Sequence, residues 1–493
     1  MSLQYWRMRT SACQDLEQNR LFVGGDPLPR AASGSYWRAP VRRCMARMRL
    51  IASVVLLLCA LSAAWAQGSS HKPQAILTVD RRPTIEEIAR RNTHAKYEPP
   101  FGCYLGAYID FDSSLKRPLR DQNGTAHQDP GGFEQIVGRA HSMYFFYLGY
   151  GRRLPLDWVR QLARWNKFVH IALEPNDGLK YVKDNAYLRQ LADDMGRSGA
   201  KIFLRFASEM NGTWTNYYRN PAEYRRKFRL VHDVMRKRAP NVAMVWCPYM
   251  EPTRNIPDYY PGDDATDWVG INLYSVTYHN NHLYEAGEQE HPCDFLSFIY
   301  RRYAERKPIM ICEYAATHYG ACENRPRPDF AIRKILTLYS ALPRLFPRIK
   351  CINYFDGNTL DFAADHAYND YSVTDDSYVT AAYRSAVSSP YFLDAPLPDT
   401  APHPPSMPMP VAKGDLLRGR VRLGCWARGP SDHVSVRYKV DGYLIYKANT
   451  PDQWECFWNA GSVRPGKHVV TLEVYNARGK KVASQTIQVA TAG

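Results

Sequence analysis

Two glutamates at the ends of short apolar runs carry the clearest chemical signal in this sequence. Glu209 lies within KIFLRFASEMNGTW at residues 201–214, and Glu313 lies within PIMICEY at residues 308–314. Runs of this kind are typical of buried parallel strands. One carboxyl group can protonate a leaving glycosidic oxygen while a second, ionised one faces the anomeric carbon. The pair therefore points to chemistry on a sugar, although a strand-end Glu paired with an Arg is the alternative.

The residues beside these glutamates suit a carbohydrate ligand. Asn211 offers an amide for hydroxyl groups, and Trp214 offers a flat apolar ring for a pyranose face. Tyr274 ends the run GINLY and is expected either to hydrogen-bond an oxygen of Glu313 or to pack at a barrel mouth.

Other acids also follow apolar runs. Glu174 and Asp110 are expected either to bond sugar hydroxyls or to act as structural partners of Arg205 and other cations. Glu251 and Asp356 are further candidates. The histidines are scattered without ligand spacing, so no metal site is expected. No cofactor is needed for the chemistry proposed for the two glutamates.

Eight apolar runs alternate with amphipathic helical patterns, which is the signature of a (β/α)₈ TIM barrel. A doubly wound sheet is the competitor, but no GxGxxG follows the first run. In the barrel, Glu209 and Glu313 end the fourth and seventh strands and face each other across the mouth. The eight runs are 101–109, 142–148, 167–173, 201–206, 242–247, 267–273, 308–312 and 350–355.

The chain divides into five predicted parts. Residues 1–66 form a leader, in which a probable mis-assigned start precedes the apolar run 50–61 and the cleavage signal Ala64-Trp65-Ala66. An entry segment (67–97), the barrel domain (98–390) and a proline-rich linker (391–412) follow. Residues 413–493 show period-two strands and turn signals, which favour a small all-β immunoglobulin-like sandwich. The leader predicts a periplasmic or extracellular protein with no membrane anchor after cleavage.

The sequence leaves open how the cysteines pair and what role the tryptophans of the C-terminal part have. Eight cysteines follow the leader, an even number that is compatible with disulfides in an oxidising compartment. Cys425 with Cys456 and Cys293 with Cys322 are the pairs we would expect first. The three tryptophans of the C-terminal part are expected to form either a sugar-binding face or a buried core; they are Trp426, Trp454 and Trp458.

The formal net charge of +16 includes +6 from the leader, where nine Arg face three acidic residues. No basic run, zinc spacing or phosphate loop accompanies it, so no nucleic-acid partner is expected. If the remaining positive charge is functional, Lys and Arg should cluster at the barrel mouth and favour an acidic polysaccharide. An even spread would indicate simple solvation.

The motifs RFASEMNGTW, VAMVWCPY, DWVGINLY and PIMICEYA, in this order, resemble glycoside hydrolase family 26 of the clan A retaining enzymes, over residues 98–390. The resemblance implies that Glu209 is the acid/base, Glu313 the nucleophile, Tyr274 its orienting tyrosine and Trp214 a stacking residue. Two positions depart from the family's mannanases, which carry His where this chain has Ser208 and Trp near the strand-eight position of Phe355.

The combined expectation is a monomeric, retaining endo-β-glycanase that acts on a mannan-like polymer, mixed-linkage glucan or bacterial exopolysaccharide. A non-catalytic polysaccharide-binding protein and a transglycosylase are the alternatives. The first would bind without cleaving, and the second would use a sugar acceptor in place of water.

Overall fold

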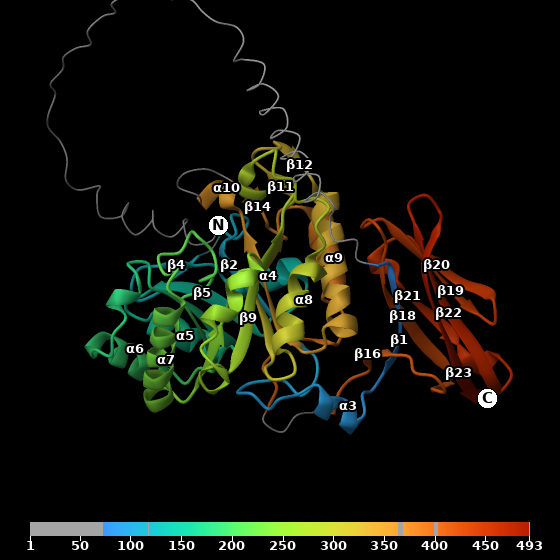
Figure 1. Cartoon of the computed structure of the whole chain (residues 1–493), viewed down its shortest axis with the longest axis horizontal. Helices are drawn as coiled ribbons and strands as arrows, with labels where there is room; N and C mark the ends of the chain where they lie inside the picture. Colours follow the sequence, from blue (N-terminus) through green and yellow to red (C-terminus); the bar gives the residue numbers. More distant parts are fainter. Residues whose placement is uncertain (1–71, 117, 363–367, 399–402, 493) are drawn as a thin grey trace, which may run out of the picture.

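The computed structural model describes residues 72–116, 118–362, 368–398 and 403–492 (Figure 1). Parallel strands pair in chain order, and the last of them pairs with the first, so the sheet closes into a barrel. Each strand falls on one of the predicted apolar runs, which confirms the TIM barrel. The eight strands are β2 (Cys103–Phe111), β5 (Met143–Gly149), β6 (Phe168–Glu174), β7 (Ile202–Phe206), β8 (Val242–Trp246), β9 (Trp268–Ser275), β10 (Ile309–Ala316) and β13 (Ile349–Gly357).

Helices connect most of these strands and cover the barrel from outside (Figure 1). Their buried faces carry the apolar residues that recur at helical spacing. Between β8 and β9 the chain makes only the short 3₁₀ segments Thr253–Tyr259 and Asp263–Ala265. The covering helices are α4 (Pro130–Val137), α5 (Leu156–Arg164), α6 (Ala186–Gly196), α7 (Pro221–Arg238), α8 (Pro292–Tyr303), α9 (Pro328–Leu345) and α11 (Ser377–Ala386).

Short elements decorate the two ends of the barrel. A three-stranded sheet lies above the carboxyl ends of the barrel strands (Figure 1). The helix α3 near the amino-terminal end starts at a capping box of Thr84 and Glu87. The remaining short elements are β3 (Leu119–Arg120), β4 (Ala126–His127), β11 (Tyr319–Gly320), β12 (Arg325–Pro326), β14 (Asn369–Asp370), β15 (Phe392–Leu393), α3 (Ile85–Arg90) and α10 (Thr359–Phe362).

The C-terminal part forms two β-sheets, as its period-two pattern predicts. Their strand orders are β16-β1-β18-β21 and β17-β23-β22-β19-β20. Asp441 and Gly442 both have positive φ in the tight turn between β19 and β20. The immunoglobulin-like topology stays a prediction. The strands are β1 (Gln74–Arg81), β16 (Met407–Pro410), β17 (Leu416–Arg418), β18 (Arg420–Arg428), β19 (Val434–Val440), β20 (Tyr443–Ala448), β21 (Glu455–Asn459), β22 (Gly466–Asn476) and β23 (Lys481–Ala492).

One strand of this C-terminal unit comes from the beginning of the described chain. β1 lies in the predicted entry segment, yet it pairs with β16 on one side and β18 on the other. Its Leu77 and Val79 are buried in the sheet, opposite Cys425 and Leu423. The polar residues that flank them made the segment look like a loop in the sequence. β16 likewise lies in the predicted linker, so two segments outside 413–493 belong to this β unit.

The β unit docks on the side of the barrel at α8 and α9 (Figure 1). Three ion pairs cross the junction: Arg344 with Glu455 at 2.8 Å, Lys334 with Asp432 at 2.5 Å and Arg428 with Asp294 at 2.6 Å. Lys334 is 1% exposed, so this pair is shielded from solvent. The junction is therefore a fixed one, rather than a flexible attachment through a linker.

The structure corrects the expected cysteine pairs and decides between the two alternatives for the tryptophans. All eight cysteines of the described residues are free thiols, so neither Cys425–Cys456 nor Cys293–Cys322 is formed. Cys425 pairs across to Leu77 and Cys456 to Leu423, so the two are not direct partners. The three C-terminal tryptophans are at most 7% exposed and belong to the core, which leaves no tryptophan face for a sugar.

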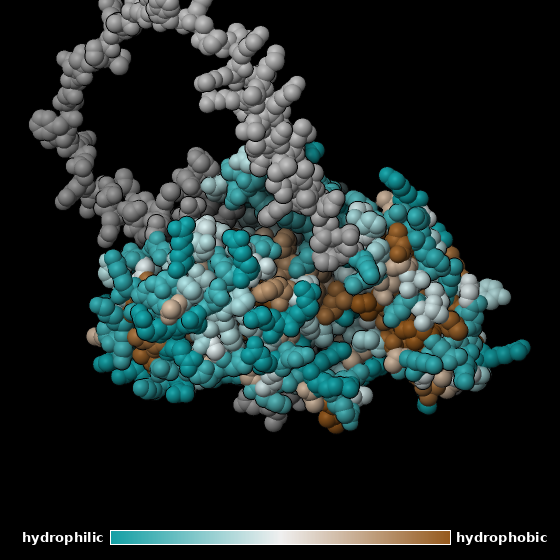
Figure 2. All heavy atoms as spheres, in the orientation of Figure 1, coloured by the Kyte–Doolittle hydropathy of each residue, from teal (hydrophilic) through white to brown (hydrophobic). Residues whose placement is uncertain are grey.

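The barrel surface in the view of Figure 2 is mostly hydrophilic, and hydrophobic side chains gather toward the C-terminal β unit. Over the described residues, none of the helices has both the length and the apolar character that a membrane crossing requires. The predicted leader (1–66) lies outside the described residues.

Candidate functional site

A strained turn places Glu209 at the barrel mouth. Directly after β7, Ala207 and Glu209 both adopt left-handed φ angles, of 50° and 59°. Such a conformation costs about 1–2 kcal/mol for a residue with a side chain. Backbone hydrogen bonds hold the turn, from Ala207 N–H to Leu173 O at 3.0 Å and from Glu209 N–H to Cys247 O at 2.9 Å. The turn is thus fixed from the neighbouring strands, as is typical of functional sites.

Two neutral N–H donors hold the carboxyl group of Glu209. The indole Nε1 of Trp214 donates to Oε2 and the amide Nδ2 of Asn272 donates to Oε1, each at 2.7 Å. The Trp214 ring lies so close over Gly212 that a Cβ there would overlap it, and it packs edge-on against Tyr249. Trp214 therefore contacts Glu209 directly. The stacking role expected from the sequence stays a prediction.

A guanidinium group and two hydroxyl groups hold Glu313. Arg205 Nη2 lies 2.6 Å from Oε1, and Tyr147 donates its hydroxyl to the same oxygen at 2.6 Å. Tyr274 donates its hydroxyl to Oε2, which confirms the contact predicted from the sequence. Arg205 and Glu313 are both fully buried, so the ion pair is shielded from water.

Arg205 and Asn272 connect the two glutamates. Arg205 Nη1 donates to Oδ1 of Asn272 at 3.0 Å, and the amide of Asn272 reaches Glu209. Below Arg205 lies His170, whose pKa is lowered well below its usual value by burial and by the guanidinium charge. His170 is therefore neutral and leaves Arg205 as the buried cation beside Glu313.

Glu174 supports the Glu209 turn from below. It accepts hydrogen bonds from the hydroxyl and backbone N–H of Ser208 and, at 2.9 Å, from the hydroxyl of Tyr217. Burial raises the pKa of Glu174 to about 7, against the lowering influence of Arg205 and of these hydrogen bonds. Of the two roles expected for Glu174, its contacts and its 2% exposure assign the structural one.

The remaining predicted ligands have mixed positions. The amide of Asn211 is buried and occupied by backbone groups of Tyr249 and Pro252, so it holds the loop after β8 instead of reaching a sugar. Asp110 contacts His127 at 3.1 Å, away from Arg205. Phe355 is 6% exposed and lies at the mouth, with one face stacked on Tyr108 at 4.7 Å.

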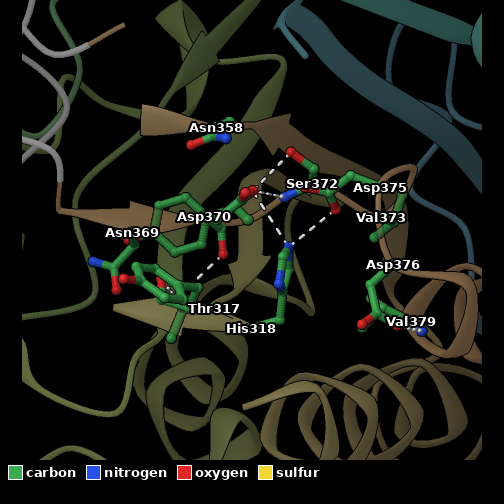
Figure 3. A network of polar contacts seen from close by, with 12 residues as sticks. Thr317, His318, Asn358, Asn369, Asp370, Ser372, Val373, Asp375, Asp376 and Val379 are labelled. Carbon is green, nitrogen blue, oxygen red and sulfur yellow. Dashed lines mark hydrogen bonds and ion pairs between the residues drawn. The ribbon is translucent and has the colours of Figure 1, made fainter. Parts of the chain in front are cut away.

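A clasp between two loops places an additional aromatic ring at the site. His318, after β10, lies 3.3 Å from Asp370 and 3.2 Å from Asp375 (Figure 3). The segment that it fastens carries Tyr371, whose ring lies 5.5 Å from Tyr274 between centroids and edge-on to Phe355. The clasp therefore helps to position the wall beside the residue that orients Glu313.

Within the described residues, the three side chains of the clasp could also form a cation site, because their donor atoms lie within 4.8 Å of one another. Burial alone would lower the pKa of His318, but the contacts with Asp370 and Asp375 outweigh it and raise the pKa to about 10. At neutral pH the ring is then protonated at both nitrogens and lacks the lone pair that a metal needs. The arrangement is an ion-pair clasp.

Four residues of the site carried only weak sequence signals, and they are Asn272, Tyr147, Arg205 and Tyr371. Asn272 and Tyr274 are two apart on β9, so strand alternation places both on one face. Tyr147 occupies the corresponding end of β5, where MYFFYLG looked like plain core. Arg205 stood in an apolar run as a cation whose possible partners were Glu174 and Asp110, whereas the structure pairs it with Glu313. Tyr371 follows a loop, and nothing in the sequence marks its position.

Relatives were found by sequence and by structure. Residues 158–288 match the family described as Glycosyl hydrolase family 26. The chain is 23% identical over 359 residues to "Endoglucanase H" of Acetivibrio thermocellus, covering 66% of this chain and 37% of that protein. It is 31% identical over 98 residues to "Beta-1,3-xylanase TXYA" of Vibrio sp., covering 18% and 20%. The chain thus spans well under half the length of these relatives.

Among solved structures, a GH26 beta-mannanase from Bacteroides ovatus is 13% identical, with 62% of this chain and 93% of that chain covered and a TM-score of 0.40. The family match covers β6 through β9 with the Glu209 turn and Tyr274. The matched region lies within the closed barrel, and this part of the chain is therefore similar to glycosyl hydrolase family 26.

Proposed function

We propose that this protein is a retaining endo-β-glycanase. The observation that carries the proposal is the contrast between two buried carboxyl groups at one barrel mouth. Glu313 is fixed by a cation and two hydroxyls, whereas Glu209 is held only by neutral N–H donors. A permanently ionised nucleophile and an exchangeable acid/base need surroundings that differ in this way.

The residues divide the reaction into two displacements. Glu209 protonates the glycosidic oxygen while Glu313 attacks the anomeric carbon, which gives a glycosyl-enzyme. Glu209 then removes a proton from water, and this water releases the sugar with net retention. Tyr147, Tyr274 and Arg205 keep the carboxylate of Glu313 aimed during both steps. This mechanism predicts carboxyl groups about 5–5.5 Å apart.

The substrate is a β-linked polysaccharide such as a mannan, a mixed-linkage glucan or a bacterial exopolysaccharide. The relatives named as an endoglucanase and a β-1,3-xylanase support a polymeric β-glycan in general. We place the reaction in the periplasm or outside the cell, because of the leader at residues 1–66.

The test is a screen of the purified protein against these polymers, with product sizes and the anomeric form of the first product recorded. Shortened chains whose new ends first appear in the β form are expected. A first product in the α form would contradict retention, and binding of every polymer without cleavage would favour a glycan-binding protein instead. Sugar-extended products with excess acceptor would indicate a transglycosylase.

A further inference from the structure

Exposed cations gather on one side of the barrel mouth. On the side of Glu209, the loops after β5, β6 and β7 carry five of them beside Asp177 and Asp184, and these five are here called the cationic rim: Arg152, Arg153, Lys180, Lys183 and Arg219. On the other side, the loop 276–291 after β9 carries Glu285, Glu288 and Glu290, which contact His282, Arg327 and His279, respectively.

The three loops of the cationic rim are joined to one another and to the Glu209 turn. Tyr150 donates its hydroxyl to the carbonyl of Lys183 at 3.4 Å, and Tyr187 donates to the carbonyl of Arg152 at 3.0 Å. Asn216, two residues after Trp214, donates to the carbonyl of Asn176. These bonds make the rim one continuous surface that ends at the catalytic turn.

The position of Arg152 shows that the rim reaches the strand ends. Its Cγ lies over Gly149, the last residue of β5, 3.6 Å from where a Cβ would stand, and Asn176 lies beside it. Burial lowers the pKa of Lys227 against the raising influence of Glu223, and Lys183 is close enough to add to the lowering, after Arg226. The rim thus concentrates positive charge at the β5–β7 side of the barrel mouth.

The cations of the rim are not neutralised within the described residues, because none of the five forms an ion pair there. Some cations on the outer barrel surface do, as Arg229 does with Asp264 and Arg238 does with Asp193. Two rim cations instead lie over aromatic rings, Lys180 over Tyr181 at 4.9 Å and Arg219 over Tyr218 at 5.5 Å. Tyr181 is 54% exposed. Ring and cation together suit a sugar that carries a carboxylate.

From this surface we infer that the substrate is an anionic polysaccharide that bears uronic acids, with its charged units on the β5–β7 side of the cleft. The inference rests on the proposed hydrolase function and narrows its substrate. The rim would therefore set the lateral position of the polysaccharide chain in the cleft.

The test compares a β-linked, uronate-bearing exopolysaccharide with the same polymer after reduction of its carboxyl groups to alcohols. The variant is Arg152→Gln/Lys180→Gln/Lys183→Gln, and the matched control removes three exposed cations from the outer helices, Arg160→Gln/Arg164→Gln/Arg236→Gln. We expect kcat/KM on the acidic polymer to fall about tenfold in the rim variant and with rising salt. On the reduced polymer, both variants should match the parent protein.

Equal losses on both polymers, or equal losses in rim and control variants, would overturn the inference. If no polymer is cleaved, the hydrolase proposal fails, and the inference is then decided by binding. Gel retardation of the parent and rim variants by the acidic polymer provides that readout. Equal retardation of the rim variant and the parent protein would refute the role of the rim in binding the acidic polymer. Stronger retardation by RNA than by the polymer would assign the surface to nucleic acid.

Discussion

The surroundings of Glu209 and Glu313 differ in charge, although both residues are fully buried at the same barrel mouth. Glu313 shares its space with the guanidinium group of Arg205, and Glu209 touches an indole and a carboxamide. A buried cation stabilises a carboxylate through its charge, whereas the neutral donors act on it only through hydrogen bonds. Under the proposed mechanism, the direct contacts of these two identical side chains give them distinct chemical roles.

The largest effect is expected on removing the nucleophile. Glu313→Ala should lower turnover by roughly 10⁴-fold or more on every cleaved polymer, because no other carboxyl group can form the glycosyl-enzyme. Added azide should restore activity and give a product of inverted configuration. Glu305→Ala, an exposed glutamate on the outer surface, is the control. Substantial residual turnover without azide would remove Glu313 from this role.

Removing the acid/base should have a smaller effect that depends on the substrate. Glu209→Ala should lose about 10²–10⁴-fold on a natural polymer, because positioned proton transfer is absent. On an activated aryl glycoside the first step needs no proton, so a burst followed by slow release is expected in stopped-flow traces. Identical losses on both substrates, with no burst, would make the two glutamates equivalent and break the comparison.

Removing the bridge between the two carboxyl groups should weaken both. Asn272→Ala deletes a donor to Glu209 and an acceptor for Arg205, and each of these bonds involves a charged group. Such bonds contribute about 1.5–3 kcal/mol, so kcat/KM should fall roughly 10–100-fold. Steady-state kinetics, with circular dichroism to check folding, measures this. An unchanged kcat/KM would mean that Asn272 merely fills space.

Two conservative substitutions should separate the glutamates by substrate. Tyr147→Phe removes a donor to Glu313, so kcat/KM should fall alike on the natural polymer and on an activated aryl glycoside. Trp214→Phe removes a donor to Glu209, so the loss should be larger on the natural polymer, whose leaving group needs a proton. Each change should cost about tenfold at most. The same pattern of losses in both variants would contradict the assigned roles.

The smallest effect on catalysis is expected at Glu174, which instead makes stability depend on pH. Because its pKa rises from 4.5 to about 7 on folding, the folded state keeps a proton that the unfolded state releases between these values. Stability is therefore lost as pH rises through this range. Glu174→Gln should gain about 3 kcal/mol relative to the parent between pH 4 and pH 8. Urea unfolding of both proteins at pH 4 and at pH 8 measures this gain. A difference in unfolding free energy that is the same at the two pH values would refute the raised pKa of Glu174.

The barrel was predictable because each strand is a short apolar run bounded by helical patterns, and such local signals need no distant contact. Glu209, Glu313 and Tyr274 were predictable because they end those runs. Asn211 was misjudged because a sequence does not reveal that its amide is satisfied by Tyr249 and Pro252. Tyr371 was missed because the ion pairs of His318 bring it to the site from a loop.

The strand β1 is an inner strand of a C-terminal sheet, although its residues come from the opposite end of the described chain. A pairing between segments so far apart in sequence carries a large loop-closure entropy and forms late in folding. During synthesis, Leu77 and Val79 must wait for Cys425 and Leu423 to emerge before they are covered. The protein should thus gain its final resistance to proteases only when its last strands are complete, and trimming either end should release the same sheet.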